Sequence, residues 1–333
     1  MKNIARNSKF NINVNFKKSF GSYLFDNRTQ RRFLDFFGMY ASLPLGYNHK
    51  AFQTDEFKTE MLEASSFKIN NCEFVSEETI SFDDVFTNFV NDGYYKNFHY
   101  TCTGALAVEA AIKTCIHRSG YRKPNVVSFR NSFHGINSLS SFITDHFWPA
   151  NKKLDGLPQD FSTKLNCDLR DVQEHLENNF VTCVLVEPIQ CSAGDIHHEN
   201  SFFSGLRQLC DKHDVPLVFD EIQVGFGGTG KVWFYQHTGV VPDIVVFGKK
   251  TQLSGIMVND SCSGIFDADQ VTRLEVTWDA DVLDMIRCKH IVKSYKQDEI
   301  IEKVSTKGKH LLSCLRENNK LLNVRGKGLI LAF

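Results

Sequence analysis

The amino-acid sequence predicts an α/β fold in which helices flank a mostly parallel central sheet, together with part of a smaller α+β domain. Two observations lead to this prediction. Short, continuous apolar runs recur along the chain, and stretches with helical periodicity separate several of them. Strands buried on both faces form continuous apolar runs, and their alternation with helices is typical of parallel sheets. The length of 333 residues suggests about two domains.

The expected elements follow in chain order. A hairpin is expected over residues 22–37, with the turn-prone stretch 26–29 between two apolar strands. A helix is expected from Gly104 towards Ser119, because Gly120 is a stop signal. Strands of the sheet are expected at the apolar runs 126–129, 183–186, 216–219 and 244–247, and helices at 172–178 and 203–213.

The C-terminal part of the chain has a different pattern. From Val282 the apolar spacing predicts a long helical stretch that continues to Leu315. Residues 324–333 predict a strand, and its apolar end leads us to expect a domain that continues beyond it. We therefore expect three parts: an N-terminal segment 1–60 within the small domain, a large domain 61–290, and the truncated start of the C-terminal small domain, 291–333.

Composition and charge exclude several classes of protein. The chain has 38 Lys and Arg against 39 Asp and Glu, so it lacks the basic excess on which binding to nucleic acids and anionic membranes depends. No apolar run approaches the ~18 residues of a membrane-spanning helix. The first 16 residues have no apolar core and do not form a secretory signal, although a basic, acid-free start also fits a transit peptide.

Cysteine and histidine spacing argues against disulfides and metals. The ten cysteines are scattered and form no C-x-x-C pair, which is typical of reduced thiols in a cytoplasmic protein. No H-E-x-x-H sequence occurs, and we expect no metal site.

A glycine-rich motif at 225–231 fits both the G-x-G-x-x-G and the G-x-x-x-x-G-K patterns of nucleotide-binding proteins. Position 232 is Val, so the hydroxyl group that would hold Mg²⁺ is absent. Asp220, the candidate Walker-B acid, lies five residues before this loop and on the same strand, whereas a P-loop enzyme needs two strands. We interpret the motif as a glycine-rich turn.

Another group of residues indicates a different chemistry. Asp220 ends one apolar strand, and Lys249 and Lys250 follow another. Ligands of open α/β sheets bind at the carboxyl ends of strands, so this acid and a lysine are expected in one crevice. A Schiff-base lysine with an acid beside a pyridine nitrogen is the arrangement that pyridoxal phosphate (PLP) requires. Residues 103–105 at a helix start offer N–H groups to a phosphate, and Phe133 offers an aromatic ring.

Three segments, 186–190, 220–230 and 242–252, carry a specific resemblance. The sequence resembles the class III, ornithine and 4-aminobutyrate type, aminotransferases of PLP fold type I over nearly the whole chain. Within that family it is most similar to the L-lysine 6-aminotransferases, as the stretches 41–48 and 104–109 support.

The resemblance implies transfer of the terminal amino group of L-lysine, or of a similar diamino acid, to a 2-oxo acid such as 2-oxoglutarate in a homodimer. It implies that Lys249 forms the Schiff base with PLP and moves a proton, and that Asp220 keeps the pyridine nitrogen protonated. It implies that Gln223 contacts both cofactor and substrate. The other cofactor-binding residues that it implies are Gly104, Ala105, Phe133, His134 and Thr277, the last of which reaches the phosphate of the neighbouring subunit.

The chain departs from the family pattern in the substrate half of the site. Ile136 stands where the family has an arginine for the substrate carboxylate, and Ser192 replaces a glutamate. Residues 279–281 are Asp-Ala-Asp in place of Gly-Gly-Asn. Two alternatives therefore stay open: a class III aminotransferase of another amine, and a degenerate or truncated PLP-fold protein that binds the cofactor without turnover.

Overall fold

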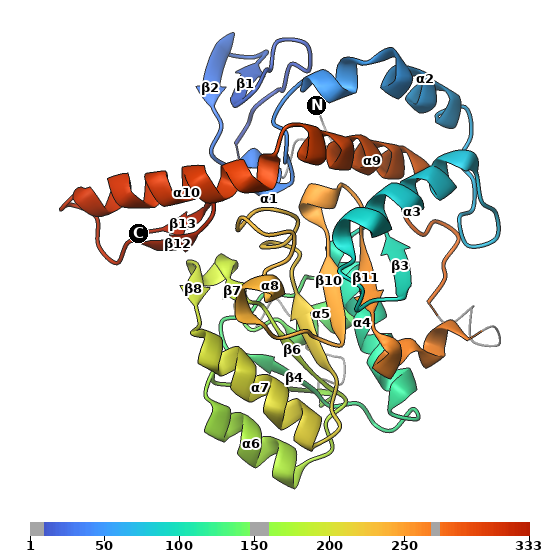
Figure 1. The fold of residues 1–333 in the computed structure, drawn as a ribbon, viewed down its shortest axis with the longest axis vertical. Helices are drawn as coiled ribbons and strands as arrows, with labels where there is room; N and C mark the ends of the chain where they lie inside the picture. The colour runs from blue at the N-terminus through green and yellow to red at the C-terminus, as the bar shows by residue number, and fades with distance from the viewer. Residues whose placement is uncertain (1–9, 147–159, 268–273) are drawn as a thin grey trace.

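A computed structural model describes residues 10–146, 160–267 and 274–333 of the chain (Figure 1). Within these residues the centre of the fold is a seven-stranded sheet of order β3-β11-β10-β9-β6-β4-β5. Strands β10, β9, β6, β4 and β5 run parallel, whereas β11 is antiparallel to both of its neighbours, so the predicted mostly parallel sheet is confirmed. The strands are β3 (Asn97–Thr101), β4 (Val126–Phe129), β5 (Ser162–Leu165), β6 (Cys183–Val186), β9 (Leu217–Asp220), β10 (Ile244–Phe247) and β11 (Ser254–Val258).

Helices cover both faces of this sheet, because successive strand residues point to opposite sides. In β10, Val245 and Phe247 belong to one apolar core, and Ile244 and Val246 belong to the other. The first core is covered by α3 (Glu77–Val90), α6 (Leu169–Asn178), α7 (Asn200–Lys212) and α9 (Val282–Gln297), and the second by α4 (Gly104–Arg118) and α5 (Ser138–Ile143). Figure 1 shows α6 and α7 side by side on their face.

Most of the predicted elements of this region are confirmed. The four predicted strands are β4, β6, β9 and β10, with β9 one residue later than expected. The helix predicted from Gly104 is α4, which begins there because the Thr103 hydroxyl accepts the N–H of Leu106. Strands β3, β5 and β11 were missed because polar residues and Gly255 interrupt their apolar pattern.

The predicted N-terminal hairpin is confirmed by β1 (Tyr23–Asp26) and β2 (Arg31–Leu34). Its turn follows Asp26 rather than starting at it, because the Asp26 carboxylate accepts the N–H groups of Arg28 and Thr29 at 3.1 and 3.0 Å.

Two predictions for the C-terminal part are wrong. The expected long helix is two helices, α9 and α10 (Ile300–Glu317), because the backbone at Glu299 is left-handed with φ 50°. The expected single strand is a hairpin of β12 (Arg325–Lys327) and β13 (Ile330–Ala332), which turns at Gly328 with φ 60°. This hairpin packs beneath α10, away from the central sheet (Figure 1).

Shorter elements connect these parts. They are α1 (Gly38–Ala41), α2 (Asp55–Ala64), α8 (Tyr235–Thr238), β7 (Ile189–Gln190) and β8 (Ile196–His197), with 3-10 helices at Lys50–Gln53, Cys191–Ala193, Lys249–Thr251 and Asp260–Phe266. In the part of the chain that the structure describes, no helix is both long and apolar enough to cross a bilayer.

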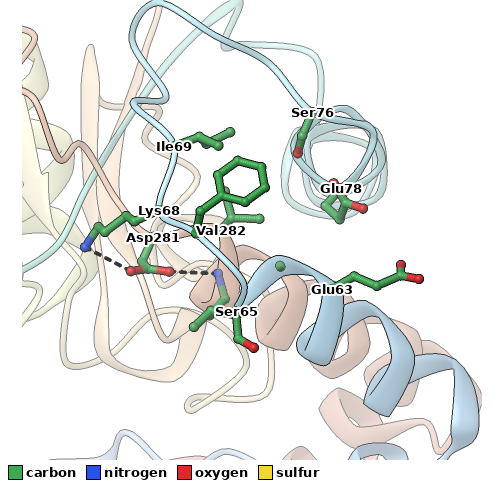
Figure 2. Close-up of a pocket in the computed structure, with 11 residues that line it drawn as sticks. Glu63, Ser65, Lys68, Ile69, Ser76, Glu78, Asp281 and Val282 are labelled. Atoms are coloured by element: carbon green, nitrogen blue, oxygen red, sulfur yellow. Dashed lines mark hydrogen bonds and ion pairs between the residues drawn. The ribbon is translucent and has the colours of Figure 1, made fainter.

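Helix α2 is joined to α9 by an ion-pair network. Glu60 lies 2.7 Å from Lys289 Nζ and 2.8 Å from His290 Nε2, and both partners are buried. A hollow of about 390 Å³ lies where α2, α3 and α9 meet (Figure 2). On its wall Lys68 pairs with Asp281 at 3.0 Å, and the same carboxylate caps α9 at the N–H of Leu283.

Candidate active site

Two neighbouring strands bring the predicted acid and amine to one edge of the sheet. Strands β9 and β10 are parallel, with Asp220 beside Val246, so both end at the same edge. Asp220 is the last residue of β9, and Lys249 lies two residues beyond the end of β10. Lys249 adopts a left-handed conformation with φ 56°, which costs about 1–3 kcal/mol outside glycine. The N–H of Gln252 closes this turn, because it donates to the carbonyl of Lys249 at 2.9 Å.

Asp220 and Lys249 line a cavity of about 250 Å³. The sequence-predicted site residues that it brings together are Gly104, Ala105, Phe133, His134, Asp220, Gln223 and Lys249. Its other lining residues are Gly135, Ile136, Glu187, Ser192 and Ile222. Ile136 and Ser192, two of the substrate-half departures, therefore line the same cavity as the predicted cofactor residues.

The Asp220 carboxylate is held by two donors. Its Oδ2 lies 2.8 Å from His134 Nδ1, and its Oδ1 accepts the N–H of Ile222 at 3.2 Å. The side chains of His134 and Asp220 are both buried. The other ring nitrogen of His134, Nε2, is buried and has no hydrogen-bond partner among the described residues. This pairing orients Asp220 and leaves an unpaired polar atom beside it.

Lys249 supplies the amine of the cavity. Its Nζ donates a hydrogen bond to Gln223 Oε1. Burial lowers the pKa of Lys249, and the opposing charges of Asp220, Cys191 and Glu187 reduce this effect. A lowered pKa increases the fraction of neutral, nucleophilic amine at neutral pH. Lys250, the alternative amine, does not line the cavity.

The N-terminus of α4 provides the anion-binding part of the cavity. The first N–H groups of a helix have no acceptor within it, and its N-terminal end carries a partial positive charge. Gly104 and Ala105 occupy this first turn and line the cavity. A Cβ atom at Gly104 would lie only 2.8 Å from Cδ1 of Ile222, so a larger residue would displace that cavity wall. This arrangement suits a phosphate group.

Sequence reasoning missed Glu187. This residue directly follows β6, lines the cavity and accepts the N–H of Phe133 at 2.6 Å. Burial, and then the charge of Asp220, raise the pKa of Glu187 well above its ordinary value. The signal was present, because Glu187 follows its strand much as Asp220 ends β9.

Thr277 is the one predicted site residue that this chain leaves outside the cavity. It is exposed in a turn, between the exposed side chains of Val276 and Trp278. Cys102 Sγ donates to the carbonyl of Trp278 at 2.9 Å, two residues before α4 begins. The turn therefore lies near the start of α4 while Thr277 faces solvent.

A family model described as aminotransferase class-III matches residues 4–333 of this chain. The chain belongs to the class-III aminotransferase family. Relatives in this family include the L-lysine-epsilon aminotransferases of Mycobacterium bovis and Mycobacterium tuberculosis, which are 33% identical over 97% of this chain and 80% of theirs. Succinylornithine transaminase of Salmonella typhi is 32% identical over 69% of this chain and 55% of its own.

Solved structures of class-III aminotransferases share the fold. Lysine aminotransferase from M. tuberculosis in the internal aldimine form superposes with a TM-score of 0.84 and 31% identity, over 96% of this chain and 81% of that one. Ornithine delta-aminotransferase of Plasmodium falciparum superposes with a TM-score of 0.76 and 25% identity, over 96% of this chain and 77% of that one. The fold is therefore that of PLP fold type I, as the resemblance implied.

Members of this family are PLP-dependent aminotransferases, and pyridoxal phosphate is the cofactor of this protein. The cavity fits that cofactor. Lys249 offers an amine for its aldehyde, the start of α4 offers N–H groups for its phosphate, and Asp220 offers a buried carboxylate for its pyridine nitrogen. The unpaired His134 Nε2 adds a polar atom at the Asp220 end.

Proposed function

We propose that this protein transfers the terminal amino group of L-lysine, or of a similar diamino acid, to a 2-oxo acid such as 2-oxoglutarate. The observation that carries the proposal is the cavity in which the half-buried amine of Lys249 and the buried carboxylate of Asp220 lie together. The identity of 33% to L-lysine-epsilon aminotransferases supports the choice of donor.

Each residue of the cavity has a role in this reaction. The cofactor supplies an electron sink for the electrons released when a C–H bond of the substrate breaks. Lys249 would hold the cofactor through its amine. When the amino donor takes the place of this amine, the free Nζ of Lys249 would carry the proton released from the substrate. Asp220 favours a protonated ring nitrogen through its negative charge. Gln223 orients the Lys249 amine, to which it is hydrogen-bonded.

The remaining residues bind and enclose the cofactor. Gly104, Ala105 and Phe133 line the cavity. The N–H groups of Gly104 and Ala105 would bind the phosphate, and the side chain of Phe133 would stack on the ring. His134 positions Asp220 through the 2.8 Å hydrogen bond.

The test records absorbance spectra of the purified chain with pyridoxal phosphate and then with L-lysine. Wild type, Lys249→Ala and a control, Lys231→Ala, are compared, because Lys231 is an exposed lysine of the glycine-rich turn. We expect a visible band in wild type and control that L-lysine bleaches, and no such band in Lys249→Ala. A band that L-lysine leaves unchanged would reject lysine as donor. A band of equal strength in Lys249→Ala would reject the role of Lys249.

Ile136 and Ser192 favour a second candidate, an aminotransferase of another amine. Ile136 is 62% exposed at the cavity and is apolar, so it offers no charge to a substrate carboxylate. A donor without a carboxylate suits this wall better. To separate the two candidates, kcat/KM is measured for diamines and for diamino acids of equal chain length. A higher kcat/KM for the diamine of each pair would favour the second candidate, and a higher value for the diamino acid would favour the first.

We propose that the unit of function is a homodimer in which Thr277 reaches the phosphate of the neighbouring subunit. Its exposed position outside the cavity of its own chain supports this role. Inactive Lys249→Ala and Thr277→Ala chains are mixed after dissociation. If the site is shared, mixed dimers contain one intact site and activity returns; no recovery would assign Thr277 to its own chain or to no role.

We also propose a domain arrangement and a cellular location. Residues 1–60 and 291–333 form parts of one small domain beside the large domain 61–290, because Gly21 and Leu45 line a common hollow with Ile300 and Leu329. The protein acts in the cytoplasm, because its ten cysteines, all in the described residues, are free thiols.

A further inference from the structure

Lys250 directly follows Lys249 in the chain. Its side chain is almost fully buried, and its Nζ donates to the backbone carbonyl of Gln223 at 2.6 Å. The side chain of Gln223 accepts a hydrogen bond from Lys249 Nζ. The two lysines therefore meet at one residue, Lys250 at its backbone and Lys249 at its side chain.

The surroundings of Lys250 hold its side chain in this place. A Cβ atom at Gly228 would lie 3.1 Å from Lys250 Cε and 3.3 Å from its Nζ, so the glycine leaves the space that the lysine fills. Glu221 is the acid that faces it, and its two oxygens accept the N–H groups of Phe234 and Tyr235 at 2.5 and 2.9 Å. Glu221 thus lies close without forming a hydrogen-bonded pair with Lys250 in the described structure.

The two amines also interact through their charges. Burial, and then repulsion by Lys249, lower the pKa of Lys250 to about 8, while Cys191 and Glu221 oppose this effect. Such repulsion is reciprocal, because a positive charge on either amine disfavours the charge on the other. The groups that favour a charged Lys249 are Asp220, Cys191 and Glu187. Removing Lys250 would leave these three groups without an opposing positive charge.

We propose that Lys250 is a positioning residue for Lys249: it fixes the Gln223 backbone, so that the Gln223 side chain meets the reactive amine, and it places a second positive charge beside that amine. This inference rests on the proposed role of Lys249. It explains why a lysine occupies a buried position at which a leucine or methionine would fill the same space. The charge keeps the neighbouring amine ready to react at neutral pH.

The test measures the pH dependence of acylation of each lysine by acetic anhydride, with mass spectrometry of the peptides. The full chain is used as wild type, Lys250→Met and Lys250→Arg, and Lys231→Met is the matched control. Methionine removes the charge and the donor at similar volume, whereas arginine keeps both. Every sample is also labelled with pyridoxal phosphate present. This readout needs no turnover.

We expect roughly tenfold slower labelling of Lys249 at neutral pH in Lys250→Met, because Lys250 carries its charge below its pKa of about 8. Lys250→Arg and the control should stay near wild type. Equal rates of Lys249 labelling at neutral pH in Lys250→Met and wild type would overturn the proposal. If Lys250→Met does not fold, the wild-type sample decides: a Lys249 midpoint at or above that of Lys231 would also overturn it. Failure of pyridoxal phosphate to protect Lys249 would instead reject the proposed function.

Discussion

His134 Nδ1 lies 2.8 Å from Asp220 Oδ2, and both side chains are buried at the floor of the cavity. A buried carboxylate depends on its donors, because burial without them strongly disfavours its charged form. His134 therefore holds the orientation of Asp220, the acid that we propose for the cofactor ring.

We expect His134→Ala to weaken binding of pyridoxal phosphate. The loss of one hydrogen bond to a buried charge costs about 1.5–3 kcal/mol, or roughly 10- to 100-fold in Kd. Fluorescence titration of the chain with the cofactor measures this change. His134→Asn is the control, because its amide can donate from a position near Nδ1 and should recover part of the affinity. Equal affinities of wild type and His134→Ala would contradict the positioning role.

The ion pair between Glu60 and Lys289 predicts a stability effect. Lys289 is buried with its Nζ 2.7 Å from Glu60 Oε1, so Lys289→Met should lower the free energy of unfolding by about 3 kcal/mol. Urea unfolding measures this loss. Lys293→Met is the control, because the Lys293–Glu56 pair is exposed and should contribute below about 1 kcal/mol.

The same pair predicts a pH dependence. Burial raises the pKa of Glu60, but hydrogen bonds from Lys289 and His290 outweigh it, and the net shift is below the ordinary 4.5. A carboxyl whose folded-state pKa is lowered stabilises the fold above its unfolded pKa and loses this effect as pH falls through the folded one. The difference in the free energy of unfolding between wild type and Lys289→Met should therefore be largest at neutral pH and decrease below pH 4.5. A difference that does not change with pH would contradict this assignment.

Gly308 brings α10 against the C-terminal hairpin. It is buried, and a Cβ atom there would collide with the backbone carbonyl of Gly328, which cannot rotate away. Gly308→Ala should destabilise this contact by about 1–3 kcal/mol, although alanine favours helices. Hydrogen exchange of β12 and β13 measures the effect. The exposed control Ser313→Ala on the same helix should leave exchange unchanged, and protection retained in Gly308→Ala would refute the collision.

Ile136 offers a direct test of substrate recognition. In Ile136→Arg a guanidinium at the cavity mouth could pair with a substrate carboxylate, worth about 1.5–3 kcal/mol. We expect KM for carboxylate-bearing substrates to fall roughly 10-fold or more, with no change for simple amines. Ile136→Gln separates charge from polarity. An equal change for both substrate classes would show that Ile136 acts through shape instead.

Local sequence patterns predicted much of the active-site frame. The apolar runs that become β9 and β10 are short and continuous, so their burial, and the strand-end placement of Asp220 and Lys249, follow from the residues themselves. The start of α4 is equally local, because the Thr103 hydroxyl caps the N–H of Leu106. Such features involve neighbours along the chain or a general property of parallel sheets.

Tertiary structure alone decided the rest, because periodicity reports which face of an element is buried but not which distant segment packs against it. It paired His134 with Asp220 across 86 positions of sequence and buried Lys250 against Gln223. It left Thr277 outside the cavity of its own chain. The break at Glu299 is of the same kind: no glycine marks it, and the packing of α9 and α10 stabilises a left-handed residue that local propensity disfavours.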